Sequence, residues 1–128
     1  ASSLRYTLVN EVSKKVDRSL RVNDIWVLEK LADVELDSLR PQMEINVAKS
    51  KLSGKGFCNR IMGSVKKLTD TELVFGEILS TRIACPAMDK EAKYTEALNN
   101  TKFYNLKNNR LTLLGTEKNE LLVYKKID

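Results

Sequence analysis

The sequence predicts a mainly β domain that carries a single helix. Short runs of β-forming residues alternate with turn-forming residues along most of the chain, with the spacing of a small sheet or barrel. One segment, residues 87–99, instead has apolar residues at helical spacing. The length of 128 residues fits one domain, whose core can close without a metal or a disulfide.

The first half of this domain is predicted to be a series of strands. Residues 25–31, which contain the only tryptophan, form the first of them. Within residues 52–58, Gly54 and Gly56 indicate a bulge or a tight bend, because glycine weakens a plain strand. The remaining strands of this half are expected at residues 43–47, 63–68, 72–75 and 78–85.

The predicted helix over residues 87–99 begins next to Pro86, a residue that is favoured in the first helical turn. Asp89 and Glu91 suit the positive N-terminal end of the helix dipole. Four residues at helical spacing form one mostly apolar stripe: Met88, Ala92, Thr95 and Leu98.

The last third of the chain predicts an antiparallel meander. Strands are expected at residues 103–106, 111–114 and 120–125. Asn108-Asn109 tolerates the positive φ of a tight hairpin, and residues 115–119 supply the second turn. Such short connections favour antiparallel pairing of sequence neighbours.

Residues 1–24 are interpreted as an N-terminal extension, and residues 25–128 as the folded domain. The extension fits a helix through the spacing of Leu8, Val12 and Val16, and equally fits a strand at residues 6–9. The first residues lack the features of a signal peptide, so either the protein is cytosolic or a targeting segment has been removed.

Composition narrows the possible chemistry. The chain has no histidine, which excludes Ser-His-Asp and Cys-His catalysis and every His-ligated metal site. Two cysteines cannot build a four-cysteine zinc site or an iron–sulfur cluster. No apolar run approaches the roughly 18 residues of a membrane helix. We therefore predict a non-enzymatic protein without catalytic, cofactor-binding or metal-binding residues.

The net charge of +5 comes from 22 basic and 17 acidic residues. A basic domain suggests nucleic acid or an anionic membrane as a partner, but interleaved charges favour a solvated surface.

Six aromatic residues have two interpretations, base stacking or core packing, and their place within apolar runs favours core packing. They are Trp26, Phe57, Phe75, Tyr94, Phe103 and Tyr124. Trp26 is predicted to anchor the core.

Several short motifs appear in a characteristic order. They are Trp26-Val27-Leu28, Cys58-Asn59-Arg60, Leu73-Val74-Phe75, Thr81-Arg82-Ile83-Ala84-Cys85-Pro86, Ala97-Leu98 and Leu111-Thr112-Leu113. Together they resemble the META domain, the family of HslJ-like heat-inducible bacterial envelope proteins. The most specific part of the resemblance is the pair formed by Cys-Asn-Arg and Thr-Arg-x-x-Cys-Pro.

The resemblance implies a small antiparallel β-barrel or strongly curved sheet with one α-helix packed against it. It also implies the bacterial cell envelope, on the periplasmic side or as an outer-membrane lipoprotein, and a link to stress tolerance. No catalytic activity is implied. A membrane would be contacted only through a lipid anchor upstream of residue 1.

Cys58 and Cys85 have three interpretations: a structural disulfide, a redox pair or two buried thiols. They do not form a Cys-x-x-Cys motif, which disfavours the redox pair. The compartment that the resemblance implies is oxidising, which favours the disulfide.

Four polar residues flank these cysteines: Asn59, Arg60, Thr81 and Arg82. If the cysteines meet, the four gather as a polar patch in which two guanidiniums could clamp a carboxylate or phosphate. In the alternative, Asn59 and Thr81 bond turn backbone, and the arginines pair with acids such as Glu77.

The sequence thus predicts a structural, interaction or stress-associated module of the envelope, whose partner is a protein or a small anionic ligand. No specific nucleic acid is expected as a partner. The rival interpretation is a small basic β-barrel that binds nucleic acid in the cytosol.

Overall fold

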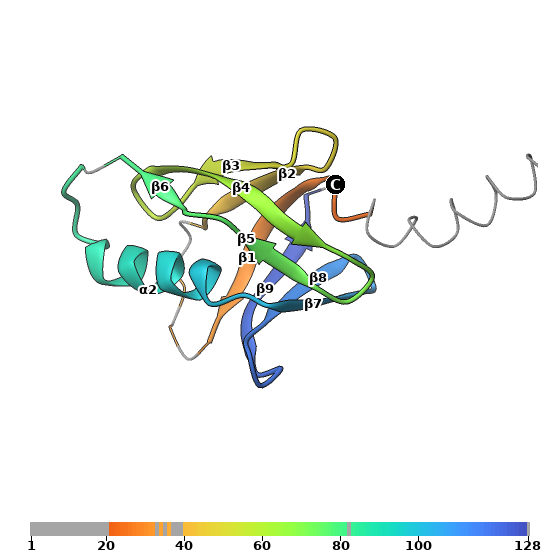
Figure 1. The fold of residues 1–128 in the computed structure, drawn as a ribbon. Helices are drawn as coiled ribbons and strands as arrows, with labels where there is room; N and C mark the ends of the chain where they lie inside the picture. Colours follow the sequence, from red (N-terminus) through yellow and green to blue (C-terminus); the bar gives the residue numbers. More distant parts are fainter. Residues whose placement is uncertain (1–20, 33, 35, 37–39, 82, 128) are drawn as a thin grey trace, which may run out of the picture.

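The computed structural model describes residues 21–32, 34, 36, 40–81 and 83–127, and Figure 1 shows their arrangement. Within this part of the chain the elements are β1 (Ile25–Leu31), β2 (Gln42–Asn46), β3 (Lys51–Lys55), β4 (Arg60–Leu68), β5 (Leu73–Phe75), β6 (Leu79–Ser80), α2 (Met88–Asn99), β7 (Phe103–Lys107), β8 (Arg110–Leu114) and β9 (Glu120–Lys126). The N-terminal extension predicted over residues 1–24 lies outside the described residues, apart from its last four.

The strands form one antiparallel sheet in the order β5-β4-β3-β2-β1-β9-β8-β7, and β6 pairs with β4. The two ends of this order meet, because Glu72 beside β5 bridges Phe103 of β7. The sheet is therefore a nearly closed barrel, with α2 lying alongside it (Figure 1). The predicted antiparallel barrel with one helix is confirmed.

Three predicted strands differ from the structure by more than one residue at a boundary. The strand predicted over residues 63–68 begins earlier, at Arg60. The strand predicted over residues 52–58 ends at Lys55, because residues 56–59 turn the chain into β4. The strand predicted over residues 78–85 is wrong beyond Ser80. Past that point Ile83 bonds the side chain of Asn59 instead of a neighbouring strand.

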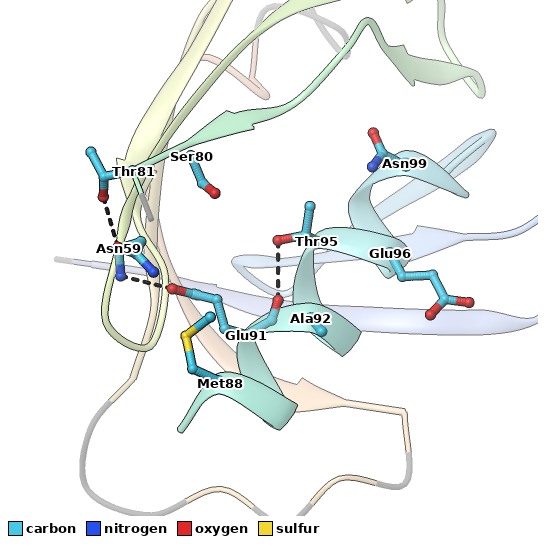
Figure 2. Close-up of a pocket in the computed structure, with 9 residues that line it drawn as sticks. All are labelled: Asn59, Ser80, Thr81, Met88, Glu91, Ala92, Thr95, Glu96 and Asn99. Atoms are coloured by element: carbon cyan, nitrogen blue, oxygen red, sulfur yellow. Dashed lines mark hydrogen bonds between the residues drawn. The ribbon is translucent and has the colours of Figure 1, made fainter. Parts of the chain in front are cut away.

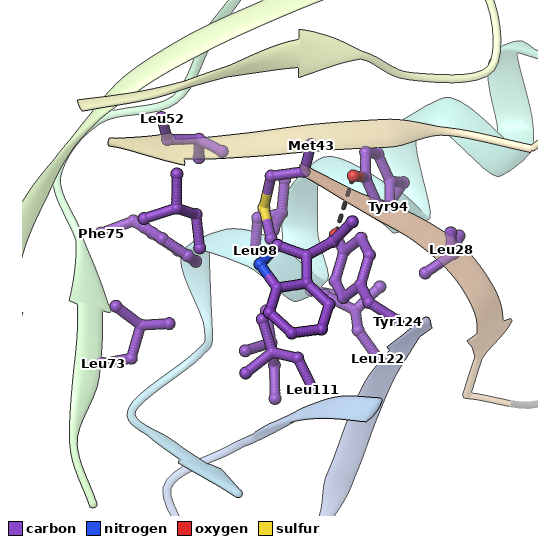
Figure 3. Packing of buried hydrophobic residues seen from close by; sticks show 14 of the residues in the cluster. Leu28, Met43, Leu52, Leu73, Phe75, Tyr94, Leu98, Leu111, Leu122 and Tyr124 are labelled. Atoms are coloured by element: carbon purple, nitrogen blue, oxygen red, sulfur yellow. Dashed lines mark hydrogen bonds between the residues drawn. The ribbon is translucent and has the colours of Figure 1, made fainter. Parts of the chain in front are cut away.

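The barrel interior holds a continuous apolar core, part of which Figure 3 shows. Trp26 is 2% exposed, and its indole N–H donates to the carbonyl of Val22 over 3.0 Å. The hydroxyls of Tyr94 and Tyr124 are fully buried and share a hydrogen bond of 2.8 Å. Burial raises the pKa of both phenols above the ordinary value. Phe57 and Phe75 are also buried, as core packing predicts, and Phe103 is half-buried.

The C-terminal hairpin follows the prediction closely. Asn108 and Asn109 join β7 to β8 with φ values of 54° and 62°. Asparagine is one of the few residues that adopts this left-handed conformation readily, so the turn fixes the register of both strands.

The predicted stripe of α2 matches its buried face only at Leu98. Met88 and Ala92 of the stripe are exposed and Thr95 is half-buried. Glu91 and Tyr94 are buried together with Leu98. A carboxylate rarely enters a core without compensating donors. The donors that Glu91 finds define the site described next. None of the described helices is both long and apolar enough to cross a bilayer.

Candidate functional site

The β3–β4 hairpin closes through a loop, residues 56–59, that wraps around the carboxylate of Glu91. The backbone N–H of Phe57 donates to Oε1 of Glu91 over 2.8 Å. The N–H groups of Cys58 and Asn59 donate to Oε2 over 3.2 and 2.7 Å. Gly56 is required here, because a Cβ at this position would meet Oε1 of Glu91.

This loop is an anion-binding site that the protein fills with its own side chain. Successive backbone N–H groups in a turn form a concavity that suits a negative charge. Glu91 is 4% exposed and receives three such donors, so its charge is buried with compensation. The Phe57 ring packs edge-on against Tyr94, one helical turn after Glu91, with the centroids 6.0 Å apart. Loop and helix are therefore locked together.

Asn59 makes the second link of the loop to the rest of the site. Its side chain is 2% exposed, and Oδ1 accepts from the hydroxyl of Thr81 and from the N–H of Ile83, both over 2.8 Å. Its Nδ2 donates to the carbonyl of Ile83 over 3.2 Å. Figure 2 shows Asn59 between Thr81 and Glu91. Asn59 thus holds the segment after β6 in place.

The third link is covalent. Cys58 and Cys85 form a disulfide whose Cα atoms are 6.4 Å apart, within the range that the bond requires. The bond joins the loop to the segment immediately before α2. Together with Asn59 and Glu91, it ties the hairpin to residues 81–91.

Arg60 of the predicted polar patch does not join this cluster. Arg60 is exposed; its backbone N–H donates to the hydroxyl of Thr81 over 3.1 Å. Among the described residues its guanidinium has no acidic partner, and Glu77 forms no ion pair with it. Arg82 lies outside the described residues, so only three members of the patch can be placed.

A shallow open depression of about 520 Å³ lies between β6 and α2 (Figure 2). Asn59 and Glu91 line it, as do Met88 and Thr95 from the helix. Every buried side-chain nitrogen or oxygen in the described part has a hydrogen-bond partner. The described residues also contain no group of three or more acidic, cysteine or histidine side chains that could hold a metal ion.

Glu91 is the central residue that sequence reasoning missed. It was expected only as a favourable charge near the helix N-terminus. The available signal was a second stripe, since Glu91, Tyr94 and Leu98 also recur at helical spacing. A charged residue within such a stripe indicates a buried carboxylate only if donors are present, and those donors come from a distant loop.

Two of the ordered motifs, Cys58-Asn59-Arg60 and the motif that begins at Thr81, supply residues to these three links. A model of the META domain family matches residues 19–128. The chain belongs to the META domain family. No curated protein matches this META domain.

Solved structures share the fold of this META domain. A protein from Burkholderia xenovorans is 24% identical with a TM-score of 0.68, over 86% of each chain. A second NMR structure is 29% identical with a TM-score of 0.63, over 83% of this chain and 91% of the other. A DUF4847 family protein from Bacteroides vulgatus, 14% identical, has a TM-score of 0.63 over 84% of this chain and 96% of its own.

Proposed function

We propose that this META domain is a non-enzymatic interaction module of the bacterial cell envelope, on the periplasmic side or as an outer-membrane lipoprotein. The Cys58–Cys85 disulfide is the observation that carries the proposal. Disulfides persist in oxidising compartments and are rare in the cytosol, where thiols are kept reduced. An association with stress tolerance belongs to the same proposal.

The polar side chains of the site are already hydrogen-bonded within the protein, which supports a non-enzymatic role. A general base or nucleophile needs a lone pair or proton that can reach a substrate. Both oxygens of Glu91 are bound by backbone N–H groups, and Asn59 is bound through both polar atoms of its side chain. These residues fix the shape of the hairpin and leave its outer surface for binding.

No observation favours the nucleic-acid alternative. Stacking of bases needs exposed aromatic faces. Of the six aromatic residues considered, Phe103 is half-buried and the other five are buried.

The test is the oxidation state and location of the protein in its native bacterium. Cells are lysed in an alkylating reagent, fractionated and digested without reduction. We expect the peptides of Cys58 and Cys85 to be disulfide-linked and the protein to be in the envelope fraction. A Cys58→Ser/Cys85→Ser variant controls for linkage formed after lysis. Alkylated free thiols in a cytosolic fraction would contradict the proposal.

A further inference from the structure

Two cations face each other on the outer surface of the same hairpin. Lys55, the last residue of β3, is directly opposite Arg60, the first of β4, and both are exposed. Side chains at directly opposed positions lie about 4.5–5.5 Å apart at Cβ, and like charges there destabilise the pair. The arrangement therefore works against folding.

Neither cation has an acidic partner among the described residues. The register places the nearest outward-facing acid of the adjoining strands, Glu44, opposite Ser53 and so diagonal to Lys55. On the other side of Lys55 the register places Gln42, which is exposed and uncharged.

A second group of opposed cations on the barrel has an acidic partner. Arg110 of β8 is opposite Lys107 of β7 and Lys125 of β9, and Glu29 accepts two hydrogen bonds from the Arg110 guanidinium, over 2.8 and 3.3 Å. This guanidinium, mainly through its hydrogen bond, holds the pKa of Glu29 below the ordinary value. Within the described part of the chain, an acid therefore pairs with a cation of the Arg110 group, and none pairs with Lys55 or Arg60.

Exposed apolar side chains lie beside the unpaired cations. Met62 follows Arg60 on the same face of β4 and is directly opposite Leu79 of β6. These side chains are 59% and 54% exposed. A depression of about 430 Å³ on this face is lined by Lys55, Arg60, Met62 and Ile25, and also by Glu44.

We propose that this face binds an anionic amphiphile. A phosphate or carboxylate group lies between Lys55 and Arg60, and the attached apolar chain lies over Met62 and Leu79. Two cations in this spacing can both donate charge-assisted hydrogen bonds to one anion. The negative charge of that anion offsets the repulsion between the two cations. The inference gives the proposed interaction module its ligand class, and it rests on surface groups that do not depend on the disulfide.

Calorimetric titration with n-decyl phosphate, below its micelle-forming concentration, tests the proposal on the full chain. Inorganic phosphate is the matched probe that lacks the apolar chain. We expect n-decyl phosphate to bind at least about tenfold more tightly, because its chain is removed from water. Lys55→Gln/Arg60→Gln should weaken its binding by about tenfold or more. Met62→Ser/Leu79→Ser should reduce its affinity to that of inorganic phosphate.

Lys93→Gln/Lys102→Gln is the control, because it removes the same charge from exposed positions away from this face. It should leave binding unchanged. Melting curves without ligand verify folding, and the Lys55→Gln/Arg60→Gln variant should melt no lower than the unmodified protein.

An equal loss of affinity for n-decyl phosphate in the control and the test variants would overturn the proposal. So would binding to phosphatidylglycerol vesicles without binding to monomeric n-decyl phosphate, which would assign the face to a membrane. Either failure leaves the disulfide and localisation test unaffected.

Discussion

The two sides of the β3–β4 hairpin differ in whether their charged side chains have partners of opposite polarity. On the inner side, three backbone N–H groups surround the carboxylate of Glu91. On the outer side, Lys55 and Arg60 face each other, and no acid in the described part of the chain pairs with either. The inner site is a completed ion-binding site, whereas the outer pair is an incomplete one.

Burial explains the difference. A charge removed from water costs several kcal/mol unless partners replace its hydration, so the fold had to supply donors to Glu91. Exposed cations stay hydrated, and their repulsion costs at most about 1 kcal/mol. The inner site is therefore essential to stability, and the outer pair can be retained for binding.

The largest effect is expected from Glu91→Ala. The substitution leaves three buried N–H groups without an acceptor, and we expect a loss of about 3–5 kcal/mol of unfolding free energy. Glu91→Gln keeps one acceptor oxygen and should lose less, about 1–3 kcal/mol. Denaturant melts of both variants check this. A loss below about 1 kcal/mol for Glu91→Ala would mean that the inner site contributes little to stability.

Reduction of the disulfide tests the covalent link of the same loop. The cysteines are 27 positions apart, for which chain entropy gives about 3.5 kcal/mol. We expect a lower melting temperature with the barrel retained, since core and sheet do not depend on the bond. Circular dichroism melts with and without reductant measure the effect. The Cys58→Ser/Cys85→Ser variant should melt like the reduced protein and should not respond to reductant.

High pH should lower the free energy of unfolding of the domain through Tyr94, on the helix that carries Glu91, and its partner Tyr124. The folded-state pKa of Tyr94 and Tyr124 is raised, so the native state retains two protons that the unfolded chain releases above about pH 10. Below about pH 10 the two protonated tyrosines contribute fully to the free energy of unfolding. Above that pH, each tyrosine lowers the free energy of unfolding by about 1.4 kcal/mol per pH unit.

The matched variant for this prediction is Tyr94→Phe/Tyr124→Phe. Because it removes both hydroxyls together, no buried hydroxyl is left without its hydrogen-bond partner. It should be close to the unmodified protein at pH 7 and lose much less stability between pH 10 and 11. Denaturant melts across this range would contradict the assignment if both proteins lost stability equally.

The smallest effect is expected on the outer side. Lys55→Gln relieves the repulsion with Arg60 and should raise the unfolding free energy by about 0.2–0.5 kcal/mol at low salt. The gain should disappear at high salt, because exposed charges are screened. A loss of stability would show that Lys55 makes a favourable contact, which would remove the contrast between the two sides.

Local patterns were sufficient to predict most of the barrel. Alternation over residues 43–47 and the Asn108-Asn109 turn are properties of neighbouring residues, and the structure has them at the expected places. The strand predicted over residues 78–85 was wrong beyond Ser80, because the side chain of Asn59 replaces a strand partner there.

The candidate site was harder to predict, because its parts come from distant segments. The helical spacing of Glu91 with Tyr94 and Leu98 does not by itself indicate a buried carboxylate, because the donors that permit its burial are more than 30 positions away. The opposition of Lys55 and Arg60 could have been predicted once residues 56–59 were recognised as the hairpin loop. Interpreting residues 52–58 as one continuous strand concealed it.

Amide NMR spectra recorded during a titration with inorganic phosphate compare the two sides of the hairpin most directly. The amide signals of Phe57, Cys58 and Asn59 should not move, because Glu91 already occupies their donors. The signals of Lys55 and Arg60 should move in a saturable way and stop moving in the Lys55→Gln/Arg60→Gln variant. Saturable shifts of the loop amides that are larger than those of Lys55 and Arg60 would contradict this account, because phosphate would then be displacing the carboxylate of Glu91.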